Sequence, residues 1–388
     1  ESFLHVITNP SSFLSALSAS RAETISAKEL AALLKKKNLT ALPSGRQAAR
    51  QGFTFINVHT PYEGEIAGTD TFIPYNEMVA NSASLPKDKN APIIIYCKSG
   101  RMSAEALPVL KKLGYTNVRH LAGGMDAWKK AGQTLLDLSK LEETVLPQNG
   151  ATLSVSWGDL GPQLIRAGVI DLAKFREAVK LTPDMEKILT QGTDEKIKID
   201  AGNSQFVVDL LWAVGLAQKS AVYDQGPMGK EYKKDIGNFA STGGWTLARG
   251  DATAYINRFD LIPLTADQQA KVGEIAKNVY RPCCGNSTWF PDCNHGMAAL
   301  AAIELMVAAG MNEKDIYKEV LALNSFFFPD NYLTVATYFA RQGTPWEKVD
   351  AKEVLGATYS SGQGAGAISK KVGPLPYKPQ QGGGACGA

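Results

Sequence analysis

Cys97 directly follows a short run of β-branched residues and opens a loop that holds Lys98, Gly100 and Arg101. A helical pattern, residues 103–113, begins as soon as the loop ends. A loop between a strand and a helix directs backbone N–H groups toward its centre, beside the positive end of the helix dipole. An anion is favoured there, so the cysteine is expected as a thiolate, the nucleophilic form. A cysteine that is merely buried would need neither the glycine nor the two cations.

We therefore predict that Cys97 and Arg101 are catalytic, with Cys97 as the nucleophile and Arg101 stabilising negative charge beside it. The other loop residues are predicted to bind the substrate: Lys98, Ser99, Gly100, Met102 and Ser103. No cofactor is predicted. The chain has only four histidines and no Cys-x-x-Cys-His motif, so a His-rich metal site and covalently attached c-type haem are not expected.

The loop and its surroundings resemble the rhodanese family over residues 22–135. Residues 53–59 resemble the buried strand of that family, 61–68 the turn after it, and 113–128 its closing signature. Several motifs in the right order are more specific than one short pattern. The resemblance implies an α/β domain with a central parallel sheet flanked by helices, and a sulfurtransferase that carries sulfur as a persulfide on Cys97.

Some residues depart from the family pattern. Asn57 and His59 stand where Asp and Arg are usual, Glu65 stands where His is usual, and Met102 occupies a position that often carries a second Arg. These differences bear on the sulfur donor and on the rate. Cysteine-based phosphatases place Arg six positions after Cys, where this chain has Ser103, so the shorter loop is expected to favour a persulfide sulfur over a phosphoryl group.

Composition limits the remaining classes. A chain of 388 residues with 44% hydrophobic content is long enough for two or three domains. The net charge of +3 comes without a basic or acidic block, so neither nucleic acid nor anionic lipid is an expected partner. The longest apolar segment, residues 297–309, contains Glu304 and is too short to span a bilayer.

Sequence character changes after residue 150, where periodic apolar patterns replace alternating strands and helices. We predict a larger, mainly α-helical domain there, and a C-terminal tail of low helical propensity that is rich in Gly, Ser and Pro. The predicted segments are an N-terminal extension 1–21, the rhodanese-like domain 22–135, a linker 136–150, the helical domain 151–356 and the tail 357–388.

A second group of reactive residues lies in the helical domain. Cys283, Cys284, Cys293 and His295 fall within thirteen residues, and a helix is expected to begin beside Cys293. The spacing matches no ordinary zinc pattern. This segment resembles a helical domain found after rhodanese domains in some bacterial exported proteins, a resemblance that implies no established activity.

Three interpretations of this cysteine cluster stay open. Two disulfides could form among its three cysteines and Cys386 of the tail, leaving Cys97 as the free thiol, as suits an oxidising compartment. A persulfide on Cys97 could instead pass its sulfur to a thiol of the cluster or to Cys386. The third interpretation is a soft-metal site that includes His295.

The sequence thus predicts a sulfurtransferase with a small sulfur-containing anion, thiosulfate or polysulfide, as donor and a thiol or protein as acceptor. The alternative is a non-catalytic rhodanese-fold binding module within a redox or metal-handling assembly. The chain begins with Glu1 rather than Met, and the four cysteines other than Cys97 could form two disulfides. We therefore expect a removed signal peptide and a periplasmic or extracellular location.

Overall fold

The buried run Ile93–Tyr96 forms strand β4 at the centre of a five-stranded parallel sheet. The structure is a computed structural model and describes residues 23–39 and 52–377. The strand order is β1-β5-β4-β2-β3, and every pair is parallel. The other strands are β1 (Thr24–Ile25), β2 (Thr54–Asn57), β3 (Thr71–Phe72) and β5 (Val118–Leu121).

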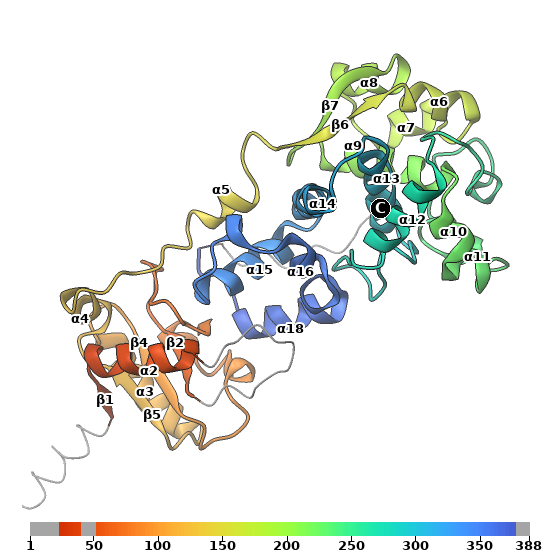
Figure 1. The fold of residues 1–388 in the computed structure, drawn as a ribbon. Helices are drawn as coiled ribbons and strands as arrows, with labels where there is room; N and C mark the ends of the chain where they lie inside the picture. Colours follow the sequence, from red (N-terminus) through yellow and green to blue (C-terminus); the bar gives the residue numbers. More distant parts are fainter. Residues whose placement is uncertain (1–22, 40–51, 378–388) are drawn as a thin grey trace, which may run out of the picture. The chain divides into compact units, whose positions relative to one another are not determined.

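Alternation along β4 supplies both faces of the sheet, because successive side chains of a strand point to opposite sides. Ile93 and Ile95 pack on one side in a core with helix α3 (Arg101–Lys112). Ile94 and Tyr96 pack on the other side with α2 (Ala27–Leu39) and α4 (Gly124–Lys130). Figure 1 shows these helices against the strands. The predicted α/β domain, with a central parallel sheet flanked by helices, is confirmed.

A larger helical region follows, as expected, and its centre is the pair α9 (Ser204–Ala217) and α13 (Asn294–Ala308). Both helices are apolar nearly all round, as befits helices buried inside a domain. A Cβ at Gly215 of α9 would lie 2.2 Å from the carbonyl oxygen of Met297 in α13, so the two backbones are in direct contact. The other helices of this region include α6 (Leu160–Ala167), α7 (Leu172–Ala178), α8 (Pro183–Thr190), α10 (Ala221–Gln225), α11 (Pro227–Lys230), α12 (Ala266–Ala276), α14 (Glu313–Phe327), α15 (Pro329–Arg341) and α16 (Ala351–Leu355).

Two strands in this region were not predicted. β6 (Ala151–Gly158) and β7 (Thr193–Ile199) form an antiparallel pair. Leu153, Val155 and Trp157 of β6 are buried while the residues between them are not. This alternation of period two was present in the sequence and is the usual signature of a half-buried strand. The expected linker 136–150 also contains a short helix, α5 (Leu141–Val145).

The predicted tail requires a correction. Residues 357–388 were expected to form a tail of low helical propensity, but α17 (Ala357–Ser360) and α18 (Gly362–Val372) lie within them. Ala365, Ile368 and Val372 of α18 are buried, and their spacing places them on one helix face. The apolar periodicity therefore outweighs the low intrinsic propensity of the glycines. Cys386 and the expected extension 1–21 lie outside the described residues.

The chain divides into two units, and each is discontinuous in sequence. The described residues up to 139, together with 337–344 and 370–377, make the first unit. Residues 140–336 and 345–369 belong to the second. Within the first unit, the carbonyl oxygen of Val372 accepts hydrogen bonds from Thr71 Oγ1 at 3.1 Å and from Arg341 Nη1 at 2.8 Å. The α/β domain is thus completed by two segments from the last sixth of the chain.

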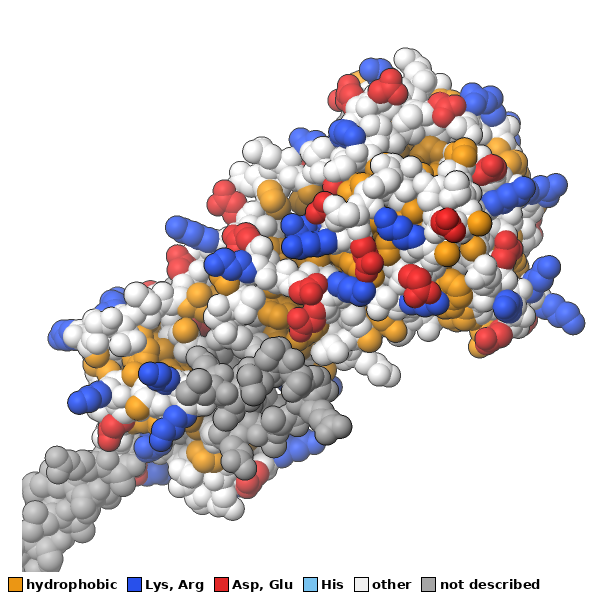
Figure 2. Space-filling model, viewed as in Figure 1, with side chains coloured by type: hydrophobic (Ala, Val, Ile, Leu, Met, Phe, Trp, Pro, Cys, Tyr) orange, Lys and Arg blue, Asp and Glu red, His pale blue; other side chains and the backbone are white. Residues whose placement is uncertain are grey.

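Within the described part of the chain, none of the helices combines the length and apolar composition that a membrane crossing requires. On the face shown in Figure 2, basic and acidic side chains are interspersed.

Candidate active site

Cys97 directly follows the last residue of β4 and is buried, with 1% of its surface exposed. Two backbone N–H groups donate to its Sγ: that of Gly100 at 3.1 Å and that of Ser103 at 3.4 Å. Ser103 lies in the first turn of α3, so the sulfur faces the positive end of that helix. Gly100 has φ +95°, a conformation that residues with a side chain rarely adopt. The backbone of this loop therefore provides a cradle for a negatively charged sulfur.

Helix α4 holds the Cys97 loop in place through backbone hydrogen bonds. The N–H groups of Met125 and Asp126 donate to the carbonyl oxygens of Cys97 and Lys98, both at 2.9 Å. Gly124 has φ +55°, and a Cβ there would lie 2.2 Å from the Cys97 oxygen. Only a glycine permits this approach. Gly124 lies within the closing signature, residues 113–128, but the sequence alone did not reveal that it positions the loop. Two adjacent glycines before a helix were the available signal.

Ser103 links Cys97 to a histidine that was not predicted as a site residue. The Cys97 sulfur lies 3.6 Å from Ser103 Oγ, and Ser103 Oγ lies 3.1 Å from His120 Nδ1. Ser103 Oγ also donates to the carbonyl oxygen of Gly100 at 3.1 Å. Burial lowers the pKa of His120, against a smaller opposing contribution from the charge of Glu23. The side of the site behind Ser103 is therefore lined by an imidazole whose neutral form is favoured.

The two loop cations are both engaged by carboxylates. Lys98 Nζ lies 2.5 Å from Glu63 Oε2, and Arg101 Nη1 lies 2.6 Å from Glu105 Oε1. These contacts raise the pKa values of Lys98 and Arg101. All four side chains are substantially exposed, and exposed ion pairs are weak. The N–H groups that donate to the Cys97 sulfur belong to the backbone, so the predicted catalytic role of Arg101 stays a prediction.

The other predicted loop residues lie where the sequence placed them. Ser99 is exposed at the tip of the loop, and Met102 is half-buried against the core that contains β4 and α3. The predicted loop residues therefore surround Cys97, but only Gly100 and Ser103 donate hydrogen bonds to its sulfur.

The unusual residue Asn57 has a structural role. Its Nδ2 donates to the carbonyl oxygen of Gly64 at 3.2 Å, and its Oδ1 accepts from the His59 N–H at 3.0 Å. An ionised Asp would lack the donor. The Asn57 side chain is thus hydrogen-bonded to both ends of the turn after β2. Within this turn, His59 Nε2 lies 3.5 Å from Glu63 Oε1.

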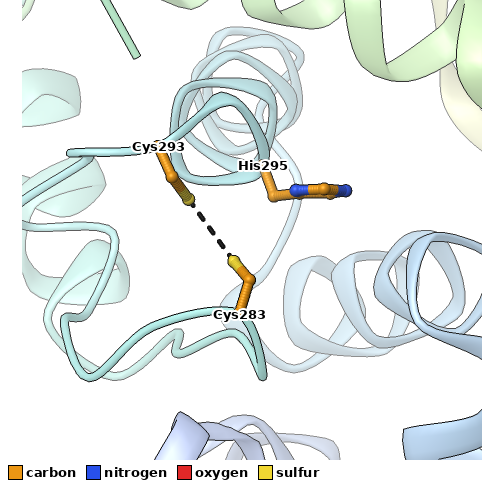
Figure 3. A group of neighbouring side chains, drawn as sticks. All are labelled: Cys283, Cys293 and His295. Atoms are coloured by element: carbon orange, nitrogen blue, oxygen red, sulfur yellow. Dashed lines mark hydrogen bonds between the residues drawn. The ribbon is translucent and has the colours of Figure 1, made fainter. Parts of the chain in front are cut away.

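The cysteine cluster of the second unit has its own geometry, shown in Figure 3. Cys293 caps the N-terminus of α13, and its Sγ lies 3.5 Å from that of Cys283. Arg281, with 1% of its surface exposed, donates from Nε to Cys293 Sγ at 3.0 Å. Sequence reasoning missed Arg281, although an arginine beside a group of cysteines was a visible signal. Its other N–H groups bind the carbonyl oxygens of Asn286 and Phe290 and the carboxylate of Asp292.

The thiols of this cluster differ in acidity. The hydrogen bond from Cys283, with others from Cys284 and His295 and the charge of Arg281, lowers the pKa of the Cys293 thiol despite its burial. The hydrogen bonds with Cys284 and Cys293, together with burial, raise the pKa of the Cys283 thiol. One cysteine of the pair is therefore favoured as the thiolate and the other as the thiol.

Two sets of donor atoms in the cluster lie close enough to be considered for a metal ion. The donor atoms of Cys283, Cys293 and His295 lie within 4.8 Å of one another, as do those of Cys284, Asp292 and Cys293. Each set has three donors, whereas structural zinc sites have four. Cys97, Cys283, Cys284 and Cys293 are free thiols in the structure. The predicted disulfides stay a prediction, since Cys386 lies outside the described residues.

Comparison with known proteins places the first unit in a family. A family model described as a rhodanese-like domain matches residues 55–131. The thiosulfate sulfurtransferase PspE of Escherichia coli is 36% identical over 73 residues, which are 18% of this chain and 69% of PspE. A sulfurtransferase of Allochromatium vinosum is 32% identical over 92 residues, 23% of this chain and 83% of that protein. The chain belongs to the rhodanese family through this domain.

A longer relative shares only this domain. The probable adenylyltransferase/sulfurtransferase MoeZ of Mycobacterium tuberculosis is 40% identical over 96 residues. The matched part is 24% of this chain and 23% of MoeZ, so the chain spans about a quarter of that relative's length.

Solved structures match over a similar part of the chain. A rhodanese-related protein from Thermoplasma volcanium is 25% identical and covers 29% of this chain and 97% of its own, with a TM-score of 0.23. A rhodanese-like domain protein from Staphylococcus aureus is 28% identical and covers 27% and 90%, with a TM-score of 0.21.

Proposed function

We propose that this protein is a sulfurtransferase that moves sulfane sulfur from thiosulfate or polysulfide, through a persulfide on Cys97, to a thiol acceptor. The observation that carries the proposal is the pair of backbone N–H groups, from Gly100 and Ser103, directed at the Cys97 sulfur. Relatives of the domain that are named sulfurtransferases support it.

The first half-reaction forms the persulfide. The Cys97 thiolate attacks the outer sulfur of thiosulfate, the S–S bond breaks, and sulfite leaves with the bonding electron pair. Charge that develops on sulfur near the loop is stabilised by N–H groups that are already oriented, so no reorganisation is needed as the bond forms. Because Cys97 is 1% exposed, small anionic donors suit the site better than bulky ones.

The second half-reaction returns the enzyme to its starting state. An acceptor thiolate attacks the outer sulfur of the persulfide, the Cys97–sulfur bond breaks, and Cys97 leaves as a thiolate. Its negative charge again faces the N–H groups of Gly100 and Ser103. The same cradle therefore stabilises both the attacking and the leaving form of the cysteine.

The decisive test is where sulfur is carried. After incubation with thiosulfate, intact mass should show one added sulfur atom, and peptide mapping should place it on Cys97. Cys97→Ser should abolish both the adduct and turnover, because a hydroxyl is a poor nucleophile at neutral pH. The matched control is Cys284→Ser, which should keep full transfer. Undiminished turnover in Cys97→Ser would overturn the proposal.

The alternative is a non-catalytic binding module in a redox or metal-handling assembly. The observation that favours it is the pairing of both loop cations with carboxylates, Lys98 with Glu63 and Arg101 with Glu105. A folded protein that takes no sulfur from thiosulfate, polysulfide or an organic persulfide would support this reading. Export, expected from the sequence, is tested separately by fractionating native cells.

A further inference from the structure

We propose that Cys293 and Cys283 form a second reactive centre, a dithiol that reduces the S–S bond of small disulfides or persulfides. Cys293 is the attacking thiolate, and Cys283 is the thiol that resolves the mixed disulfide. The centre lies wholly in the second unit, and it does not depend on the sulfur transfer proposed for Cys97.

The strongest observation is the buried cation beside Cys293. Arg281 is 1% exposed, and its Nε donates to Cys293 Sγ at 3.0 Å. Removing a guanidinium from water is costly unless anionic or polar partners surround it. Its other N–H groups are held by two carbonyl oxygens and by the Asp292 carboxylate, so the guanidinium is fixed in place. A fixed cation in contact with sulfur favours the thiolate over the thiol.

Helix α13 adds a second stabilising contact. Cys293 is the N-cap of this fifteen-residue helix, and its Sγ accepts from the N–H of Gly296 at 3.4 Å. Gly296 is required here, because a Cβ would lie 2.7 Å from the Arg281 guanidinium. The helix start and the arginine therefore meet at the same sulfur. Cysteines at helix N-termini next to a cation are the ones that react as nucleophiles.

Cys283 lies where it can resolve a mixed disulfide on Cys293. Its Sγ lies 3.5 Å from Cys293 Sγ, so forming a disulfide bond of about 2.05 Å requires only a small approach of the two sulfurs. Cys283 is exposed and Cys293 is half-buried. A small substrate can therefore reach Cys293, whereas a large folded one is disfavoured.

The same charge counts against a resident metal cation. The two candidate donor sets share Cys293, the sulfur that Arg281 contacts. A metal ion bound there would stand beside a fixed positive charge, and either set would supply only three protein ligands. The Arg281 charge stabilises a thiolate at Cys293, whereas it would repel a metal cation bound there.

The proposed step balances as follows. The Cys293 thiolate attacks one sulfur of R–S–S–R′, the S–S bond breaks, and R′S⁻ leaves with the electron pair. Cys283 gives its proton to a departing thiolate and attacks Cys293 Sγ, releasing RS⁻ and forming the Cys283–Cys293 disulfide. The dithiol is oxidised by two electrons and the substrate is reduced. With a persulfide the second product is hydrogen sulfide, and an excess of small thiol regenerates the dithiol.

The test uses the full chain in a Cys97→Ser background, so that the first site cannot contribute. The reduced protein is mixed with oxidised glutathione in one arm and with glutathione persulfide in the other, and released thiol or sulfide is counted per chain. No Lys or Arg lies between Cys283 and Cys293, so trypsin leaves them in one peptide. Cleavage before Asp292 separates them and identifies the cross-link.

The expected result is a Cys283–Cys293 disulfide in both arms, with two thiols released per disulfide consumed or one hydrogen sulfide per persulfide. Cys283→Ser should stop at a stable glutathione adduct on Cys293. Cys293→Ser should slow the reaction at least about tenfold, the loss expected when a thiolate stabilised by a neighbouring cation is replaced by an ordinary thiol. Cys386→Ser is the matched control and should keep the full reaction.

Three results would overturn the proposal. One is a cross-link that uses Cys284 or Cys386 in place of Cys283. Another is an adduct on Cys283 that forms as fast in Cys293→Ser as in the parent. The third is a stoichiometric metal ion in the purified protein whose removal is needed before either thiol reacts. Failure here with Cys97 persulfidation intact would leave the sulfurtransferase proposal standing, and the reverse also holds.

Discussion

Arg341 donates to both carboxylate oxygens of Glu65, from Nε at 2.7 Å and from Nη2 at 3.2 Å, and both side chains are buried. Burial alone would lower the pKa of Arg341, but the adjacent Glu65 charge outweighs it and the pKa is raised. The glutamate stands where the family usually has histidine, so this departure supplies the partner of a buried arginine. The exchange belongs to the architecture of the first unit rather than to its sulfur chemistry.

Removing one member of this pair should destabilise the first unit strongly. Glu65→Gln or Arg341→Met leaves the other charge buried without a counter-ion, which costs about 3–5 kcal/mol. Urea denaturation followed by circular dichroism measures the loss. The matched control is Glu105→Gln, which removes the exposed partner of Arg101 and should leave the midpoint unchanged. A Glu65→Gln midpoint equal to the parent's would show that the pair contributes no stability.

Gly124→Ala should impair sulfur transfer as well as stability. The new Cβ would overlap the carbonyl oxygen of Cys97 and displace the loop. We expect at least about a tenfold fall in kcat/KM, since a small misplacement of reacting groups is costly. Gly132→Ala is the control: Gly132 also has a left-handed φ, +78°, but nothing lies within 4 Å of its Cβ position.

In the control, only backbone strain of about 1–2 kcal/mol is expected, with transfer unchanged. Equal kinetic losses in Gly124→Ala and Gly132→Ala would show that the close approach of α4 to the loop is not what positions Cys97.

Arg101 is predicted to leave Glu105 when an anionic donor arrives. Arg101→Ala should then lower kcat/KM for thiosulfate by about 10²-fold, the size of effect seen when one oriented donor is lost. Arg101→Lys should recover part of the rate, because the charge is kept but the fork of N–H groups is lost. Glu105→Gln should not slow transfer, since it frees the guanidinium. If Arg101→Ala reacts at the parent rate, the backbone N–H groups suffice.

Glu304 should make the second unit less stable as pH rises. Burial raises the pKa of this residue to about 8. The unfolded chain loses the proton near its ordinary value of 4.5, whereas the folded chain holds it until about pH 8. The folded state therefore binds more protons between these values, and the free energy of unfolding falls as pH rises through them. Asp209, whose pKa burial raises to about 6, acts in the same direction.

The measurement is chemical denaturation at several pH values from 5 to 8.5. Glu304→Gln keeps the shape of the side chain but cannot ionise, so it should flatten the pH dependence and raise stability by a few kcal/mol at pH 8. A pH profile unchanged in Glu304→Gln would assign the loss of stability to other groups.

The sequence predicted best where the determinants are local. The β-branched run before Cys97, the glycine after it and the helix that follows lie within about twenty positions, and each pattern has one usual structure. The cysteine loop and the parallel sheet could therefore be predicted. β6 carried an equally clear alternation, but its neighbourhood is dominated by helical patterns.

What the sequence could not give was the choice of partners. The Arg101–Glu105 pair has i,i+4 spacing on α3 and could have been predicted. Lys98 pairs instead with Glu63, which lies far earlier in the chain, and only the fold brings these two together. The contact between Arg281 and the Cys293 sulfur is evident only in the folded structure. Such pairings depend on three-dimensional closure, which local propensity does not encode.

The separation of Glu65 and Arg341 by 276 positions has a consequence for biosynthesis. Translation proceeds at roughly 5–20 residues per second, so the glutamate waits for roughly 14–55 s before its arginine has been made. During that interval the nascent α/β domain has no Arg341 to pair with the Glu65 carboxylate, which is buried in the finished protein. A ribosome-bound chain arrested before residue 341 should therefore be more open to proteases around Glu65 than the finished protein.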